Sequence, residues 1–121
     1  MATTRTTLSA SRSGRSIPID ATARDSATLI HAVERPSDAA MSAIEEIWIY
    51  ATNHTGGAVT LTLMWGASQE DVDDVILSVP ASSGLTLVIP GLLLEAGTFV
   101  GAIASSTSSI NVLGYAIRTE R

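Results

Sequence analysis

The chain of 121 residues contains no cysteine and no lysine. Without cysteine it can form no disulfide, no thiolate metal site and no cysteine nucleophile. Without lysine it can form no Schiff base, and arginine is left as the only strong cation. These two absences remove much of covalent catalysis from the functions open to the chain. A chain of this length has room for one domain with one hydrophobic core.

Long uninterrupted apolar runs are also missing. The most apolar region, residues 87–117, is interrupted by Pro90-Gly91, by Glu95-Ala96-Gly97 and by a serine- and threonine-rich run at 105–109. A helix needs about 20 consecutive apolar residues to cross a bilayer. We therefore expect no membrane partner, and we interpret this region as core and covered surface.

Charge is distributed unevenly along the chain. Residues 1–19 carry Arg5, Arg12 and Arg15 and no acid, whereas residues 20–121 carry four arginines and all twelve acidic residues. The serine, threonine, alanine and arginine composition of residues 1–26 predicts a flexible basic arm, followed by a folded domain at 27–121. The arm could contact the acidic body of a neighbouring copy, remain a solvated tail or act as an organellar transit peptide. The acidic body itself is not expected to bind nucleic acid.

Alternation of apolar and polar residues is the main structural signal. It is clearest where Val59, Leu61, Leu63 and Trp65 fall on one face of a strand. Comparable patterns predict further strands at 28–34, 43–52, 73–79, 85–89, 98–104 and 110–118, with turns at 53–57, 80–84, 90–91 and 105–109. The sequence therefore predicts an all-β fold, a single β-sandwich or jelly-roll-like domain.

One segment allows a second interpretation. Asp38 could cap a short helix that places Met41, Ile44 and Trp48 on one side. The run Ile47–Tyr50 is rich in β-branched and aromatic residues, which favours a loop followed by a strand. We therefore expect a strand at 43–52.

Some predicted strands are apolar on both faces. Trp48 and Tyr50 alternate with Ile47 and Ile49, and residues 99–104 are similarly apolar throughout. A two-layer sandwich buries only one face of each sheet, so the other face requires a further covering layer. Other copies of the chain, most simply in a homotrimer, would provide that layer. We predict an interface formed by Arg5, Arg12, Arg15, Trp48 and Tyr50.

No pattern points to catalysis or to a cofactor. His31 and His54 are the only histidines and do not make a metal site, and no nucleophile motif is present. The acidic run Glu70–Asp74 could bind calcium through alternate carboxylates, but it lacks the glycine and distal glutamate of an EF-hand loop. Asn53 begins a short glycosylation sequon that arises often by chance. We expect no enzyme activity, no catalytic or metal residues and no cofactor.

A series of motifs runs through residues 28–121: Trp65-Gly66, the following acidic loop, Pro80, the apolar segment GLTLVIPGLLL at 84–94, the predicted strand GTFVGAIAS at 97–105 and the closing strand with Gly114, Tyr115 and Arg118. With these motifs the region resembles small virion proteins of tailed bacteriophages. The resemblance implies a β-sandwich that assembles as an oligomer on a larger particle, and it implies no catalytic residues.

The resemblance favours a capsid decoration, or cement, protein that binds the major capsid protein and stabilises the phage head. The expected location is then the virion, assembled in the bacterial host cytoplasm. A head–tail connector or tail component, and a ligand- or sugar-binding β-module, remain as alternatives.

Overall fold

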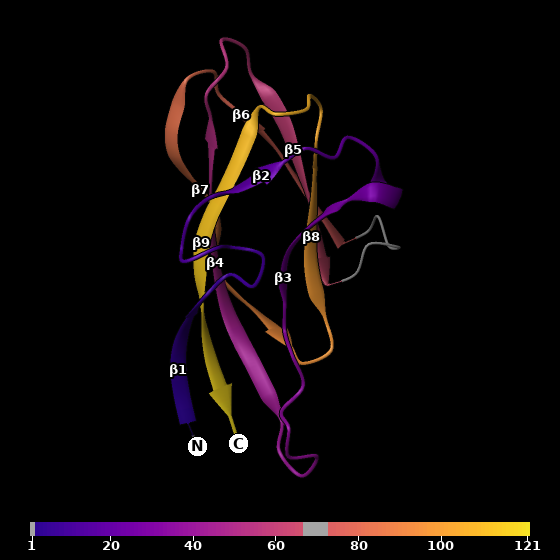
Figure 1. Cartoon of the computed structure of the whole chain (residues 1–121), viewed down its shortest axis with the longest axis vertical. Coiled ribbons are helices and arrows are strands. Elements are labelled where there is room, and N and C mark those ends of the chain that lie inside the picture. Colours follow the sequence, from indigo (N-terminus) through magenta and orange to yellow (C-terminus); the bar gives the residue numbers. More distant parts are fainter. Residues whose placement is uncertain (1, 67–72) are drawn as a thin grey trace.

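The computed structural model describes residues 2–66 and 73–121, which form two antiparallel sheets packed face to face (Figure 1). One sheet, called sheet A, has the strand order β1-β9-β4-β7, with β2 also paired to β9. The other, sheet B, has the order β3-β8-β5-β6. The strands are β1 (Ala2–Thr7), β2 (Ile17–Ile19), β3 (Thr28–Ala32), β4 (Ala43–Asn53), β5 (Val59–Gly66), β6 (Asp74–Val79), β7 (Ser83–Glu95), β8 (Phe99–Ala104) and β9 (Ile110–Glu120).

The connectivity is that of a jelly roll. Four antiparallel pairs are nested in sequence: β5 with β6, β4 with β7, β3 with β8, and β1 and β2 with β9. Successive pairs belong to alternate sheets, as when one long hairpin is wrapped around a core. The predicted β-sandwich is confirmed.

The core lies between the inner faces of the two sheets. In β4 every second side chain is buried, including Ile47, Ile49 and Ala51. Leu61 and Leu63 of β5 meet them from sheet B and are fully buried. This alternation is the one predicted from the sequence, because successive side chains of a strand point to opposite faces.

Most strands lie where the sequence predicts them, including the strand that begins at Ala43 in place of the alternative helix. The prediction of a turn at Pro90-Gly91 was wrong. Both residues lie inside β7, whose register against β4 shifts on either side of Trp48. Gly91 has a φ of 82°, which suits an irregularity in an edge strand better than a regular ladder. Because β7 is an edge strand, the missing N–H of Pro90 is tolerated there.

The N-terminal segment forms part of the sandwich, so the predicted boundary between an arm at 1–26 and a domain at 27–121 was wrong. β1 pairs with the C-terminal half of β9, and β2 with its N-terminal half (Figure 1). Leu8 and Ile19 are fully buried, and Ile17 is 4% exposed. Three apolar anchors and backbone pairing therefore hold this segment in the fold although its composition is polar.

Part of the outer face of sheet B is covered by the chain itself. Met64 is fully buried although it is absent from the core cluster between the sheets. The backbone oxygen of Ala21 accepts a hydrogen bond from the backbone N–H of Ala104, and Ala27 packs beside Gly101. The covering is partial, because Ile76 on the same outer face is 64% exposed.

The packing of the N-terminal segment predicts how substitutions there will act. Replacing Leu8 or Ile19 by alanine removes side chains from the closed core and should lower the free energy of unfolding by about 2–5 kcal/mol. Arg12→Ala, at an exposed position of the same segment, should change it by less than about 0.5 kcal/mol. Denaturant unfolding followed by circular dichroism measures both. Equal stability of all three variants would mean that the segment does not contribute to the core.

Candidate interaction surface

The outer face of sheet A carries a row of apolar side chains that the chain does not cover. Side chains directly opposite one another in an antiparallel pair lie on the same face. Trp48 is paired with Tyr115 of β9 and Pro90 of β7, and Tyr50 is paired with Leu113 and Leu87. We call these residues, with two neighbours in the next row, the outer patch: Trp48, Tyr50, Leu87, Pro90, Leu93, Leu113, Tyr115 and Ile117.

The β7 side of the outer patch is the most exposed. Leu87 is 47% exposed and Leu93 58%, and Leu85 of the same strand is 66% exposed. Single exposed leucines are ordinary on protein surfaces, but several on one strand beside partly exposed aromatic rings form a contiguous apolar patch. Such a patch is typical of a protein–protein interface.

Trp48 is held rigidly at the centre of the patch. Its ring stacks on Tyr115 with centroids 6.1 Å apart and planes at 9°, and its Nε1 donates a 2.7 Å hydrogen bond to Glu46 Oε2. On the other side it lies over Gly91, where a Cβ would come within 2.8 Å of the indole. A rigid, half-buried aromatic residue with a satisfied N–H is suited to anchoring a contact.

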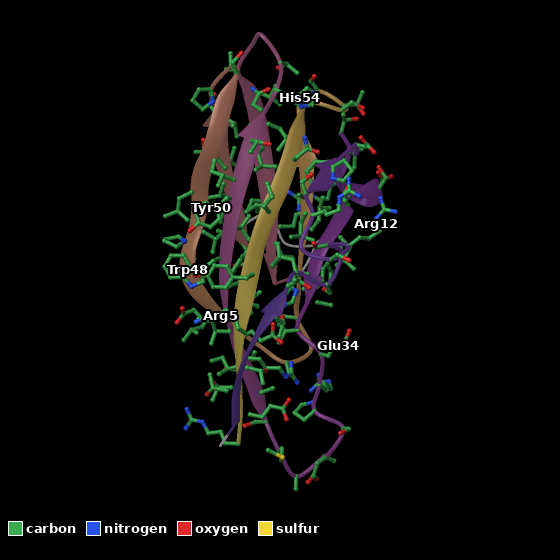
Figure 2. The ribbon with its side chains drawn as sticks, turned by 60° about the vertical axis from the view of Figure 1, so that its left-hand side comes forward. Arg5, Arg12, Glu34, Trp48, Tyr50 and His54 are labelled. Atoms are coloured by element: carbon green, nitrogen blue, oxygen red, sulfur yellow. The ribbon has the colours of Figure 1, made fainter. Side chains whose placement is uncertain are left out.

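The structure brings together three of the five residues predicted to form an interface. Trp48, Tyr50 and Arg5 lie on the outer face of sheet A, with Arg5 paired to Ile117 in the register of β1 with β9. Figure 2 shows Arg12 on the other side of the molecule from Trp48 and Tyr50. Arg12 and Arg15 lie in the turn between β1 and β2, where the Arg15 N–H donates to the Arg12 carbonyl oxygen. They therefore do not belong to the outer patch.

Sequence reasoning missed a buried polar network at one end of the sandwich. The Glu45 carboxylate accepts from His31 Nε2 at 2.5 Å and from Arg118 NH1 at 2.6 Å. The backbone N–H of Ser9 donates to His31 Nδ1 at 2.9 Å, so the imidazole carries its proton on Nε2. Arg118 also donates to Glu120 at 2.7 Å. The network joins β3, β4, β9 and the N-terminal segment, which lie far apart in the sequence.

The partners of Glu45 determine its titration. Burial raises the pKa of this carboxyl, but hydrogen bonds from His31 and Arg118, together with the positive charge of Arg118, outweigh burial and hold the pKa below its ordinary value. Hydrogen bonds to Glu120 and Glu45 raise the pKa of Arg118. The network is therefore charged at neutral pH and ties the two sheets together.

The other polar residues considered as candidate site residues have structural roles, as far as they lie within residues 2–66 and 73–121. The buried Asn53 amide donates to the Gly57 and Val79 carbonyl oxygens and accepts from Thr55, so it holds a turn. His54 contacts Asn111 at 3.5 Å. Asp74 forms an ion pair with Arg24, whereas Glu70 and Asp71 of the suggested calcium loop lie outside the described residues.

Residues 2–66 and 73–121 contain no group of three or more His, Cys, Asp or Glu side chains that could hold a metal ion. Over the same ranges, no helix has the length and apolar character needed to traverse a bilayer.

Two hollows lie at the end of the sandwich near Glu95. One, of about 370 Å³, is lined by Arg35, Met41 and Glu95 among others. The other, of about 280 Å³, borders the outer face at Ile44, Glu95, Thr119 and Arg121. The aromatic residues of the outer patch do not line either hollow, so no aromatic platform for a sugar ring is present in them.

Comparisons of the chain with protein-family models, with curated proteins and with solved structures find no match.

The lowered pKa of Glu45 predicts a pH dependence of stability. A carboxyl with a lower pKa in the folded state stabilises the fold above its unfolded value near 4.5, and this contribution is lost as pH falls through the folded value. Glu45→Gln should lower the free energy of unfolding by about 1–3 kcal/mol at neutral pH, because it removes the charged acceptor of the hydrogen bonds from His31 and Arg118, while Arg118 keeps Glu120. It should also flatten the loss of stability that occurs as pH falls below the ordinary pKa near 4.5.

Denaturant unfolding at several pH values measures this effect, with Glu34→Gln at an exposed position as the matched control. Parallel pH profiles for Glu45→Gln and the unmodified protein would contradict the role assigned to the network.

Proposed function

We propose that the chain is a structural virion protein of a tailed bacteriophage, a decoration protein that binds the phage head and stabilises it. The outer patch is the observation that carries the proposal. It presents Trp48, Tyr50 and the β7 leucines together on the outer face of sheet A, whereas the chain itself covers part of the outer face of sheet B. A surface of this kind fits a protein that works by contact.

The sequence resemblance at 28–121 supports the same proposal. The apolar segment at 84–94 that carries part of the resemblance is β7, the strand with the most exposed leucines of the patch. Jelly rolls also occur among viral capsid proteins, although the same architecture serves lectins and cupins, so fold alone does not assign the function.

The mechanism follows from repetition. A capsid presents the same junction between its subunits many times, and a small rigid protein that assembles with its own copies can bind each one. Individually modest contacts add up when the copies are linked to one another, because the second contact forms at high effective concentration. The buried network and the nested topology keep the domain rigid, so little ordering is required on binding.

The alternatives differ in copy number and position. A connector or tail component of the same particle would use the same outer patch but occur in a few copies at one vertex or along the tail. A ligand-binding module would use the hollow beside Arg35 and Glu95. The separation of that hollow from the aromatic residues favours the decoration protein over a sugar-binding module.

Mass spectrometry and electron cryo-microscopy of virions whose genome encodes the chain test the proposal. We expect the chain in many copies per particle, regularly placed on the head surface. A few copies at the head–tail junction would support the connector alternative instead. Absence of the chain from purified virions would contradict both.

A loss-of-function measurement complements the copy number. Heads assembled without the chain should release DNA at a lower temperature than complete heads, and purified chain should restore the release temperature. Unchanged heat resistance of heads without the chain would contradict a stabilising role.

A further inference from the structure

The charged groups around the outer patch indicate what covers it. Arg5 and Glu95 border the patch, and within residues 2–66 and 73–121 neither side chain has an ion-pair partner. Glu46, the third charged residue of this face, lies on the central strand β4 and keeps its negative charge while it accepts a hydrogen bond from Trp48. The two charges at the edges of the face, Arg5 and Glu95, are one cation and one anion.

The two edge charges lie at opposite sides of the sheet. Arg5 is on β1 at one edge of sheet A, and Glu95 is on β7 at the other edge. Three strand spacings separate the edges, roughly 14 Å, so the two cannot pair within one molecule. The two residues lie at similar positions along the strand direction. The register places Arg5 in the same cross-strand row as Leu93, which is two residues from Glu95 in β7.

We propose that the outer patch packs against further copies of this chain, with Arg5 of each copy paired to Glu95 of the next. Such a contact joins the β1 edge of one copy to the β7 edge of its neighbour. It is a head-to-tail contact, which closes into a ring when the copies are arranged around an axis parallel to the strands. The outer patches then face the axis and one another.

Three features of the face support a copy of this chain as the occupant. The patch consists of uncharged residues, and Glu46, the one charged residue between them, already accepts a hydrogen bond from Trp48. The two border charges have opposite sign and lie at similar positions along the strands, so a single contact between copies pairs one with the other. The hollow at Ile44, Glu95 and Thr119 opens beside the carboxylate and offers space for an arginine side chain, with Arg121 at its rim.

The edge strand itself determines the mode of contact. An exposed strand edge invites another strand to extend the sheet, but Pro90 and the register shifts of β7 interrupt the ladder there. The contact therefore uses side chains of the face in place of backbone pairing. The inference deepens the proposed function by naming the partner of the same surface, and it can be tested without any virion.

The test compares charge reversals in the isolated protein. Arg5→Glu or Glu95→Arg should weaken self-association by about tenfold or more, because each places like charges together. The double variant Arg5→Glu/Glu95→Arg should recover it by exchanging the two charges. Both positions are exposed, and circular dichroism verifies the fold. Arg12→Glu, away from the patch, is the matched control and should leave association unchanged.

An apolar pair of variants tests the same surface independently. Leu93→Asp should abolish association, whereas Ile76→Asp, at a residue 64% exposed on β6 of sheet B, should not. Sedimentation velocity and native mass spectrometry at micromolar concentration give the association state of each variant.

A monomeric unmodified protein would overturn the inference, as would a double reversal no better than either single one. Because these measurements need no particle, they separate the two proposals. A ring-forming chain that is absent from virions would refute the proposed function and leave the contact between copies intact.

Discussion

The antiparallel pairing of β4 with β9 is the constraint on which the rest of the structure depends. It runs from Ala43 opposite Glu120 to Asn53 opposite Ile110 without a register shift. Because side chains alternate along a strand, this one register sends Ile47 and Ile49 into the core and Trp48 outward onto Tyr115. A slip by one residue would exchange the two sets. Gly114 allows the close approach, since a Cβ there would lie 2.0 Å from the Trp48 carbonyl oxygen.

The same pairing organises the polar end of the sandwich. Glu45 and Arg118 are directly opposite in this register and form an ion pair across it, which Glu45 extends to His31 on the other sheet. Burying charges has a desolvation cost, which these partners offset through hydrogen bonds in one fixed geometry. His31 in turn accepts from the Ser9 N–H, so the network also positions the segment between β1 and β2. Core, outer patch and N-terminal strands thus follow from one alignment.

The sequence predicted the strands that bury a regular apolar face and missed those that do not. β4 and β5 were predictable because apolar residues recur at every second position. β1 reads Ala-Thr-Thr-Arg-Thr-Thr and offers no such pattern, and its place is set by backbone pairing with β9 and by Leu8 beyond its end. The alternation around Pro18, with Ile17 and Ile19 on one face, was the available signal for β2.

The candidate surface was predictable in part for the same reason. The two-faced pattern at 47–50 placed Trp48 and Tyr50 outward, as observed, whereas Arg12 and Arg15 could not be located because the path of the N-terminal segment was unknown. No spacing rule connects His31 with Glu45 or Arg5 with Glu95, since only the topology brings the first pair together and sets the second at opposite edges.

The central claim is that the outer face of sheet A is the surface through which the protein acts. Hydroxyl-radical footprinting with mass spectrometry, comparing the dilute monomeric chain with the chain in its assembled state, tests it most directly. The account predicts strong protection of Trp48, Tyr115 and Leu93 on assembly, with Ile76 of sheet B remaining accessible. Protection of Ile76 with unchanged labelling of Trp48 and Leu93 would contradict it.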